Sequence, residues 1–105
     1  MNKKIVIFTT AGSLDEAYKI ARGLVGRRLA ACVNIVPKIV SIYRWEGKVE
    51  EAEEWLVMIK TTESASARLC EAIRELHSYE VPECICIPVE GGSAAYLKWI
   101  EESVE

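Results

Sequence analysis

No run of apolar residues in this 105-residue sequence is long enough to cross a membrane, because the longest runs hold only a few residues. The N-terminal segment MNKKIVIFTT starts with basic residues but lacks both an apolar region of signal-peptide length and a cleavage site. We therefore expect a cytoplasmic protein that has no membrane partner.

Positive charge is scarce and scattered along the chain. The sequence has 13 lysine and arginine residues against 16 aspartate and glutamate residues, which gives a formal net charge of -3. The basic residues occur singly apart from Lys3-Lys4 and Arg27-Arg28. This pattern argues against a nucleic-acid partner held by phosphate attraction, whereas the acidic balance is compatible with binding cations.

Residue types that mark common active sites are also few. His77 is the only histidine, no nucleophile is paired with a base, and no glycine-rich loop precedes a helix to cradle phosphate. The cysteines have no CxxC spacing, which argues against an iron–sulfur protein or a soft-metal chaperone. They are Cys32, Cys70, Cys84 and Cys86. We predict a protein that is not an enzyme and whose thiols are reduced.

The sequence does contain a long stretch, Leu29 to Thr62, that is typical of a single β-hairpin. Glu46-Gly47 provides a two-residue turn, and β-branched and aromatic residues flank it on both sides. Each arm holds roughly 15 residues, about 50 Å if extended, which exceeds the usual strand length. Part of the hairpin is therefore expected to project beyond its domain. Pro37 cannot donate to a ladder, so it marks the first arm as an edge strand.

The projecting end is expected to carry Tyr43, Trp45 and Trp55. Two isolated strands with bulky aromatic side chains are neither stable nor soluble in water, and a neighbouring subunit would cover both the aromatics and the strand edge. We predict an obligate oligomer built on the hairpin; singly exposed apolar residues are the alternative. The acidic run Glu46 to Glu54 is expected to be a solvated tip rather than a site.

The remaining segments complete a strand, helix, strand, strand, helix, strand order. The expected elements are a strand at Lys4–Thr10, a helix at about Leu14–Arg28 with a Ser13/Glu16 capping box, a helix at Glu63–His77 capped by Thr62 or Ser64, a strand at Val81–Val89, and a short terminal helix capped by Ser93. This order predicts one α+β domain over residues 1–105 with the ferredoxin-like βαββαβ fold plus a C-terminal helix. Its four-stranded antiparallel sheet would have the last strand and the Pro37 arm at its edges.

One polar cluster joins the second helix to the last strand. A lone histidine at a helix C-terminus is favoured by the dipole and by the last carbonyls, so His77 is first interpreted as a cap. As metal ligands, His77, Glu80 and Glu83 would suit copper or zinc, held weakly unless another subunit completes the shell. Cys84 and Cys86 share one strand face and would add thiolates, although a packed strand face explains them better.

Five runs that span nearly the whole chain resemble the CutA family of divalent-cation tolerance proteins. They are AACVNIVP (Ala30–Pro37), SIYRWEGKVEE (Ser41–Glu51), IKTT (Ile59–Thr62), HSYEVPE (His77–Glu83) and AYLKWI (Ala95–Ile100). The resemblance implies a ferredoxin-like subunit of a tight homotrimer, similar in build to the PII signalling proteins, with a role in tolerance of copper and other divalent ions. The family's proposed copper ligands correspond here to Thr9, Leu76 and His77, of which only His77 matches. Cys32 keeps the family's ACV motif as an interface or core residue.

Two functions from different classes remain open at this point. One is a metal-responsive protein that binds a divalent ion at His77 and nearby carboxylates. The other is a trimeric sensor or scaffold that holds a small molecule or a partner protein in clefts between subunits, as the PII-like build suggests.

Overall fold

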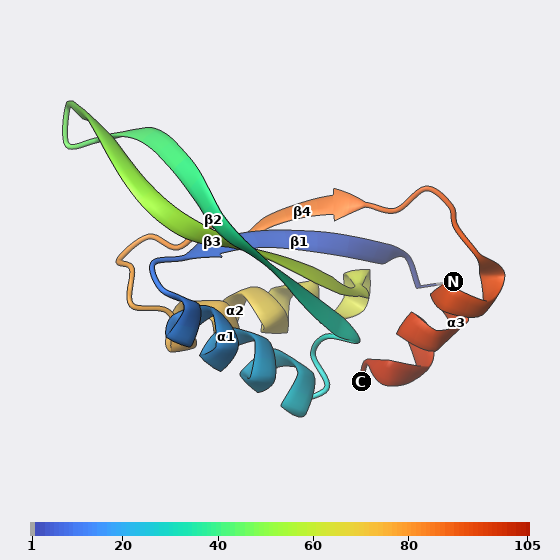
Figure 1. Ribbon diagram of the computed structural model, residues 1–105. Coiled ribbons are helices and arrows are strands. Elements are labelled where there is room, and N and C mark those ends of the chain that lie inside the picture. Colours follow the sequence, from blue (N-terminus) through green and yellow to red (C-terminus); the bar gives the residue numbers. More distant parts are fainter. Residues whose placement is uncertain (1) are drawn as a thin grey trace.

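Side chains along the first strand alternate between buried and partly exposed positions, so one face of the sheet is covered more fully than the other. A computed structural model describes residues 2–105 (Figure 1), and Met1 of the predicted domain lies outside the described residues. The elements are β1 (Lys4–Ala11), α1 (Leu14–Gly26), β2 (Cys32–Trp45), β3 (Lys48–Thr62), a 3-10 turn (Glu63–Ala65), α2 (Ser66–Leu76), β4 (Ile85–Pro88) and α3 (Ala94–Ser103). All strand pairs are antiparallel and the order is β2-β3-β1-β4. The predicted ferredoxin-like α+β fold is confirmed, with β2 and β4 at the edges.

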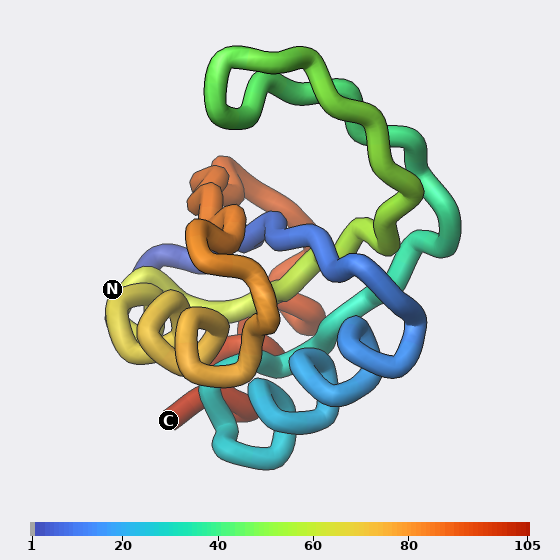
Figure 2. The backbone as a smooth tube through the Cα atoms, turned by 90° about the vertical axis from the view of Figure 1, so that its left-hand side faces the viewer, coloured from blue at the N-terminus to red at the C-terminus, as the bar shows by residue number. Residues whose placement is uncertain are grey.

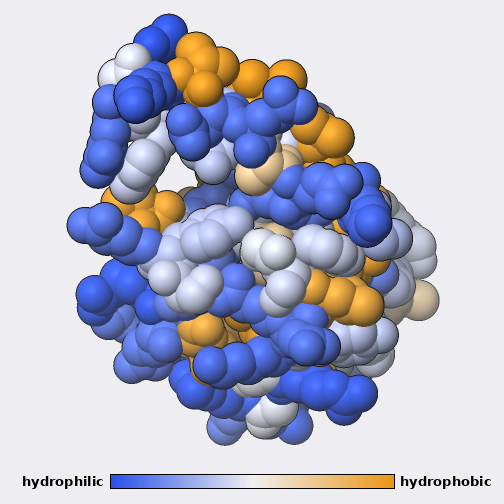
Figure 3. Space-filling model, turned by 60° about the vertical axis from the view of Figure 1, so that its left-hand side comes forward, coloured by the Kyte–Doolittle hydropathy of each residue, from blue (hydrophilic) through white to orange (hydrophobic). Residues whose placement is uncertain are grey.

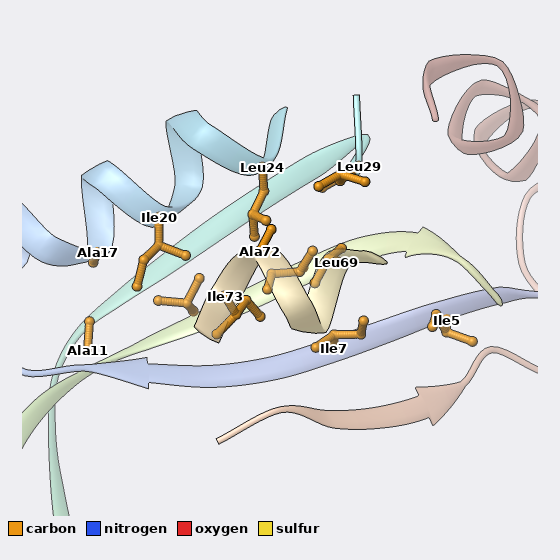
Figure 4. Close-up of a cluster of buried hydrophobic side chains, with 13 residues drawn as sticks. Ile5, Ile7, Ala11, Ala17, Ile20, Leu24, Leu29, Leu69, Ala72 and Ile73 are labelled. Atoms are coloured by element: carbon orange, nitrogen blue, oxygen red, sulfur yellow. The ribbon is translucent and has the colours of Figure 1, made fainter. Parts of the chain in front are cut away.

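The core lies between one face of this sheet and helices α1 and α2. Ile5, Ile7 and Ala11 of β1 are buried on that face, and antiparallel pairing places Val57 and Ile59 of β3 beside them. Helices α1 and α2 close the layer with apolar side chains one or two turns apart, shown with the strand residues in Figure 4. Within residues 2–105, no helix combines the length and the apolar character needed to span a membrane.

The hairpin projects beyond the sheet, as its length predicts. Strand β1 pairs with β3 only from Thr62 to Trp55, so the remainder of β3 pairs with β2 alone. Figure 1 shows this end leaving the body, and Figure 2 shows it curling back above the segment that leads into β4. Trp55 is opposite Ala11 and packs against the core. Its expected place on the projecting end is therefore wrong.

A bulge at Pro37 bends the first arm of the hairpin. The pairing of β2 with β3 shifts between Val36 and Ile39, which leaves Pro37 and Lys38 outside the ladder. Lys38 has a φ of 51°, and a bulge of this kind increases local twist. Pro37 thus lies on an edge strand, as predicted, and the bulge accounts for the curl of the projecting end.

Glu46 and Gly47 form the tight turn of the hairpin. Their φ angles are 49° and 80°, and two positive angles in a two-residue loop are typical of a type I′ turn. A Cβ atom built at Gly47 would have no neighbour within 4 Å. A substitution there would therefore act through the backbone alone.

Gly47→Val is expected to destabilise the protein by about 1 to 2 kcal/mol, because a β-branched residue is strained at positive φ. Gly47→Asn is the matched control, since asparagine tolerates this region far better. Thermal melting followed by circular dichroism compares the two variants. Equal melting temperatures for wild type and Gly47→Val would contradict this role of the turn.

Three elements differ most from their predicted bounds. Helix α1 ends at Gly26, because Arg28 has a φ of 60° that a helix does not continue through. Helix α2 begins only after the 3-10 turn, and neither expected residue caps it; the Thr62 and Ser64 hydroxyls hydrogen-bond to each other instead. The last strand contains only Ile85–Pro88, because β1 pairs with it only along Ile5 to Phe8.

The prediction that all four thiols are reduced is wrong. Cys70 of α2 and Cys84, just before β4, form a disulfide with their Cα atoms 6.1 Å apart. Folding brings the two residues together on the helix-covered side of the sheet, where both pack against the core. Cys32 and Cys86 are free, and Cys86 is exposed. The expected shared strand face of Cys84 and Cys86 does not form, because Cys84 lies outside β4.

Candidate functional site

His77 is a buried connector between the ends of α2 and β1. Its Nε2 lies 2.5 Å from the carbonyl oxygen of Thr10, and its Nδ1 accepts a hydrogen bond from the backbone N–H of Tyr79 at 3.1 Å. Because Nδ1 is the acceptor, this network assigns the proton to Nε2, which donates to Thr10. The ring therefore bonds to β1 rather than to the last carbonyls of its own helix, and both of its nitrogens have protein partners.

Glu16 fastens the same two loops from the other side. Its Oε2 accepts the backbone N–H of Ser78 at 2.8 Å, and its Oε1 accepts that of Gly12 at 3.3 Å. The Ser13 hydroxyl accepts the N–H of Glu16, so half of the predicted capping box is present. The Glu16 carboxylate accepts the N–H of Gly12 and not that of Ser13, which the capping box predicts. Burial opposes ionisation of Glu16, but the bonds from Ser78 and Gly12 lower the pKa of this carboxyl below its ordinary value.

A cleft of about 550 Å³ lies between the curled hairpin and the segment that follows α2. Figure 3 shows a hollow between the projecting end and the body of the molecule. The cleft is lined by Thr10, Ser41, Ile42, Tyr43, Trp45, Glu54, Tyr79, Glu80, Val81 and Glu83. Cross-strand pairing places Ser41, Tyr43 and Trp45 on the same face of the hairpin as Glu54.

Glu54 is the buried carboxylate of this cleft. Its exposed fraction is 7%, and its Oε2 accepts a hydrogen bond from the Tyr79 hydroxyl at 2.7 Å. The prediction that Glu46 to Glu54 form a solvated tip is therefore wrong at its last residue. The alternation of side chains along β3 indicates that Glu54 lies on the same face of the sheet as Leu56 and Met58. The segment that covers Glu54 is distant in the sequence, so β3 alone does not predict that Glu54 is buried.

The electrostatics of the cleft follow from this burial. Burial, and then the charge of Glu54, raise the pKa of Glu83 above its ordinary value. Burial, and then the hydrogen bond to Glu54, raise the pKa of Tyr79 well above its ordinary range, so its hydroxyl keeps its proton at neutral pH. Three carboxyl groups, those of Glu54, Glu80 and Glu83, line the cleft, and no lysine or arginine is among its lining residues.

The structure separates the predicted metal ligands. Glu80 and Glu83 line the cleft together, whereas His77 does not and uses its ring nitrogens on backbone groups. In residues 2–105, no group of three or more His, Cys, Asp or Glu side chains is arranged to hold a metal ion. The family's other two positions offer no replacement: Thr9 is buried with an unpartnered hydroxyl, and Leu76 packs against the core. Metal binding by this chain stays a prediction.

The predicted interface residues fall into different surroundings. Tyr43 and Trp45 are 43% and 44% exposed on the projecting end, while Trp55 is partly buried in the core of its own chain. Cys32 is partly exposed at the start of β2, where its thiol lies 3.8 Å from the side-chain oxygen of Asn34. Only Tyr43 and Trp45 therefore extend beyond the body as expected.

The geometry defines a class of protein: a ferredoxin-like domain with one overlong hairpin curled over an acidic cleft. A family model described as "CutA1 divalent ion tolerance protein" matches residues 5–103. This chain therefore belongs to the CutA1 family.

Individual relatives agree with this assignment. The chain is 50% identical to "Protein CutA homolog" of Xenopus laevis, over 90% of this chain and 69% of that protein. It is 49% identical to "Protein CutA" of Mus musculus over 93% of this chain, and it spans about half, 55%, of that relative. The solved structure of the divalent cation tolerance protein (Cut A1) from Thermus thermophilus superposes with a TM-score of 0.95 at 45% identity, covering 97% of this chain and 99% of that one.

Proposed function

We propose that this protein acts, as a homotrimer, in the response to divalent cations, and that it binds a divalent ion, copper or zinc, through Glu80 and Glu83 of the segment that follows His77. The observation that carries the proposal is that two carboxyl groups, Glu80 and Glu83, line one cleft. Oxygen and imidazole donors suit zinc and copper. Because residues 2–105 of one chain bring together no group of three such ligands, a neighbouring subunit would complete the shell.

Two surfaces of the chain support the proposed trimer. The sheet face that points away from α1 and α2 carries apolar residues, and Ile85 and Ile87 of β4 are 52% and 40% exposed on it. Both sheet edges, β2 and β4, lack a partner strand within residues 2–105. Exposed edges and large apolar patches are usually covered by another chain, and a closed ring of identical subunits covers both.

Light scattering across a dilution series is expected to give three times the chain mass of 11.8 kDa down to micromolar concentration. In a closed ring, every subunit makes the same two contacts with its neighbours. Incomplete assemblies with an uncovered surface should therefore not accumulate. A single-chain mass at micromolar concentration would remove the basis for the assembly.

Calorimetric titration with copper and zinc chloride tests the metal proposal. We expect saturable binding that the double change Glu80→Gln with Glu83→Gln weakens at least tenfold, because neutral amides are poor ligands for these ions. Glu53→Gln is the matched control, since Glu53 is exposed on the same hairpin and outside the cleft. No heat above the buffer blank for either metal would reject the proposal.

A second candidate function is the binding of a small molecule by a PII-like sensor or scaffold. The size of the cleft favours it, because about 550 Å³ lies within the range of small-molecule pockets and far exceeds the space of one ion. The family model and the relative from Thermus thermophilus are named for divalent ion tolerance rather than for a reaction, so we propose a role without catalysis in both cases. We keep the cytoplasm as the proposed location. The disulfide is more typical of oxidising compartments, so fractionation of cells tests that location.

A further inference from the structure

Few noncovalent contacts hold the stretch from Glu80 to Cys84, in the segment that joins α2 to β4. The residues on either side are bonded, because Ser78 and Tyr79 donate their backbone N–H groups and β4 pairs with β1. Within residues 2–105, the stretch itself makes no hydrogen bond and no ion pair. Pro82 also has no N–H to donate. Partial burial of residues 82–84 is the main noncovalent support of the stretch.

The Cys70–Cys84 disulfide anchors this stretch to the rigid part of the domain. Cys70 lies on α2 beside Leu69, Ala72 and Ile73, which are buried in the core. Cys84 is the last residue before β4. The covalent bond thus fixes the end of the stretch to a helix that the core holds in place. Segments with few hydrogen bonds and little burial open most readily, so the stretch depends on this bond for its order.

The disulfide lies where a thiol reductant can reach it. Both of its cysteines are only partly buried. They lie on the helix-covered side of the sheet, and the proposed subunit contact uses the opposite face. Partly exposed disulfides are the labile and regulatory ones. In the cytoplasm, the location proposed above, disulfides are usually transient or redox-sensing. A permanent cross-link fits neither the exposure of this bond nor that compartment.

We propose that reversible reduction of the Cys70–Cys84 disulfide switches residues 80–84 between a fixed and a mobile state while the rest of the domain stays folded. A glutathione thiolate attacks one sulfur, the Sγ–Sγ bond breaks, and a mixed disulfide forms while the other cysteine leaves and takes up a proton. A second glutathione thiolate resolves the mixed disulfide. The products are two protein thiols and one glutathione disulfide. The switch goes beyond the proposed function and does not depend on metal binding.

The effect of reduction reaches the projecting hairpin through Tyr79. This residue directly precedes the stretch, and its hydroxyl donates to Glu54 of β3 at 2.7 Å. The core does not use the stretch, since its fully buried side chains come from β1, β3, α1 and α2. Reduction is therefore expected to free residues 80–84 and to weaken the bond to the hairpin without unfolding the core.

A glutathione titration of the folded full chain tests whether the bond opens reversibly. The protein is equilibrated with buffers of increasing ratio of reduced to oxidised glutathione, and peptide mass spectrometry after alkylation follows Cys70 and Cys84. We expect both cysteines to pass together from the bridged to the alkylated form, and to return to the bridge when oxidised glutathione is added back. A bridge that opens only after urea has unfolded the chain overturns the proposal.

NMR relaxation of the backbone amides in the oxidised and the reduced protein tests the mobile state. We expect the order parameters of Val81, Glu83 and Cys84 to fall from about 0.85 to below about 0.6 on reduction, while those of α1 stay near about 0.85. Cys86→Ser is the matched control: it removes an exposed free thiol but keeps the bridge, so it should respond to reduction as the wild type does. Cys70→Ser should resemble reduced wild type in both buffers.

Reduced wild type is the primary sample, so the test is decided even if Cys70→Ser does not fold. Equal order parameters for residues 81–84 in the two redox states overturn the proposal. A fall in order parameters along the whole chain also overturns it, because the bond would then support the entire fold rather than one segment.

Discussion

Cys70→Ser is expected to lower the free energy of unfolding by about 3 kcal/mol, the value typical for a cross-link that closes a loop of this size. The bridge joins residues 14 positions apart and ties α2 to the segment that leads into β4. That segment has little else to hold it, because β4 contains only four residues and is an edge strand. Urea unfolding at fixed protein concentration, with and without dithiothreitol, measures the effect.

The free thiol of Cys86 provides the matched control for this experiment. It is exposed and lies two residues from Cys84, so Cys86→Ser should change stability by no more than about 0.5 kcal/mol. Reduced wild type should unfold at the same urea concentration as Cys70→Ser. A wild type that is indifferent to reductant would contradict the stabilising role of the bridge.

Trp45→Ala is expected to lower both the melting temperature and the oligomer mass at low protein concentration. The side chain is 44% exposed in the single chain and lies near the hairpin turn. If a neighbouring subunit covers it completely, its truncation costs roughly 3 to 5 kcal/mol per subunit. In a closed ring that cost recurs at every copy. A melting curve paired with mass determination across a dilution series measures both effects.

Tyr18 on α1 offers the comparison, because it is a 48% exposed aromatic on a different element. Tyr18→Ala should leave the oligomer mass unchanged and shift stability by no more than about 0.5 kcal/mol. If Trp45→Ala behaves in the same way, Trp45 lies in solvent. The sheet edges alone would then have to explain any assembly.

The sequence predicts the fold well because local signals agree with one another. Two-residue turn chemistry at Glu46-Gly47, serine caps at Ser13 and Ser93, and helical spacing of apolar residues all appear where expected. Pro37 also identifies its edge strand correctly. Each of these depends on neighbours within a few residues.

The candidate site depends on distant neighbours and is only partly predictable. The types and spacing of Glu80 and Glu83 predict them as site residues, but Glu54 is buried only because the hairpin curls toward Tyr79, 25 positions away. The Cys70–Cys84 bridge likewise depends on how α2 packs on the sheet. His77 finds its partner in Thr10, 67 positions earlier, and no local pattern marks that pair.

The bulge between Val36 and Ile39 also decides which side chains of the hairpin face Glu54. Strand β2 advances by three residues there while β3 advances by two, from Leu56 to Glu54. Because side chains alternate between the two faces of a strand, this one additional residue turns Tyr43 to the side of Glu54. The same sequence paired without the bulge would present Arg44 to that side instead, whereas deleting Lys38 would remove the bulge and leave Tyr43 beside Glu54. The chemistry of the cleft therefore depends on how the two strands pair as much as on the identity of their residues.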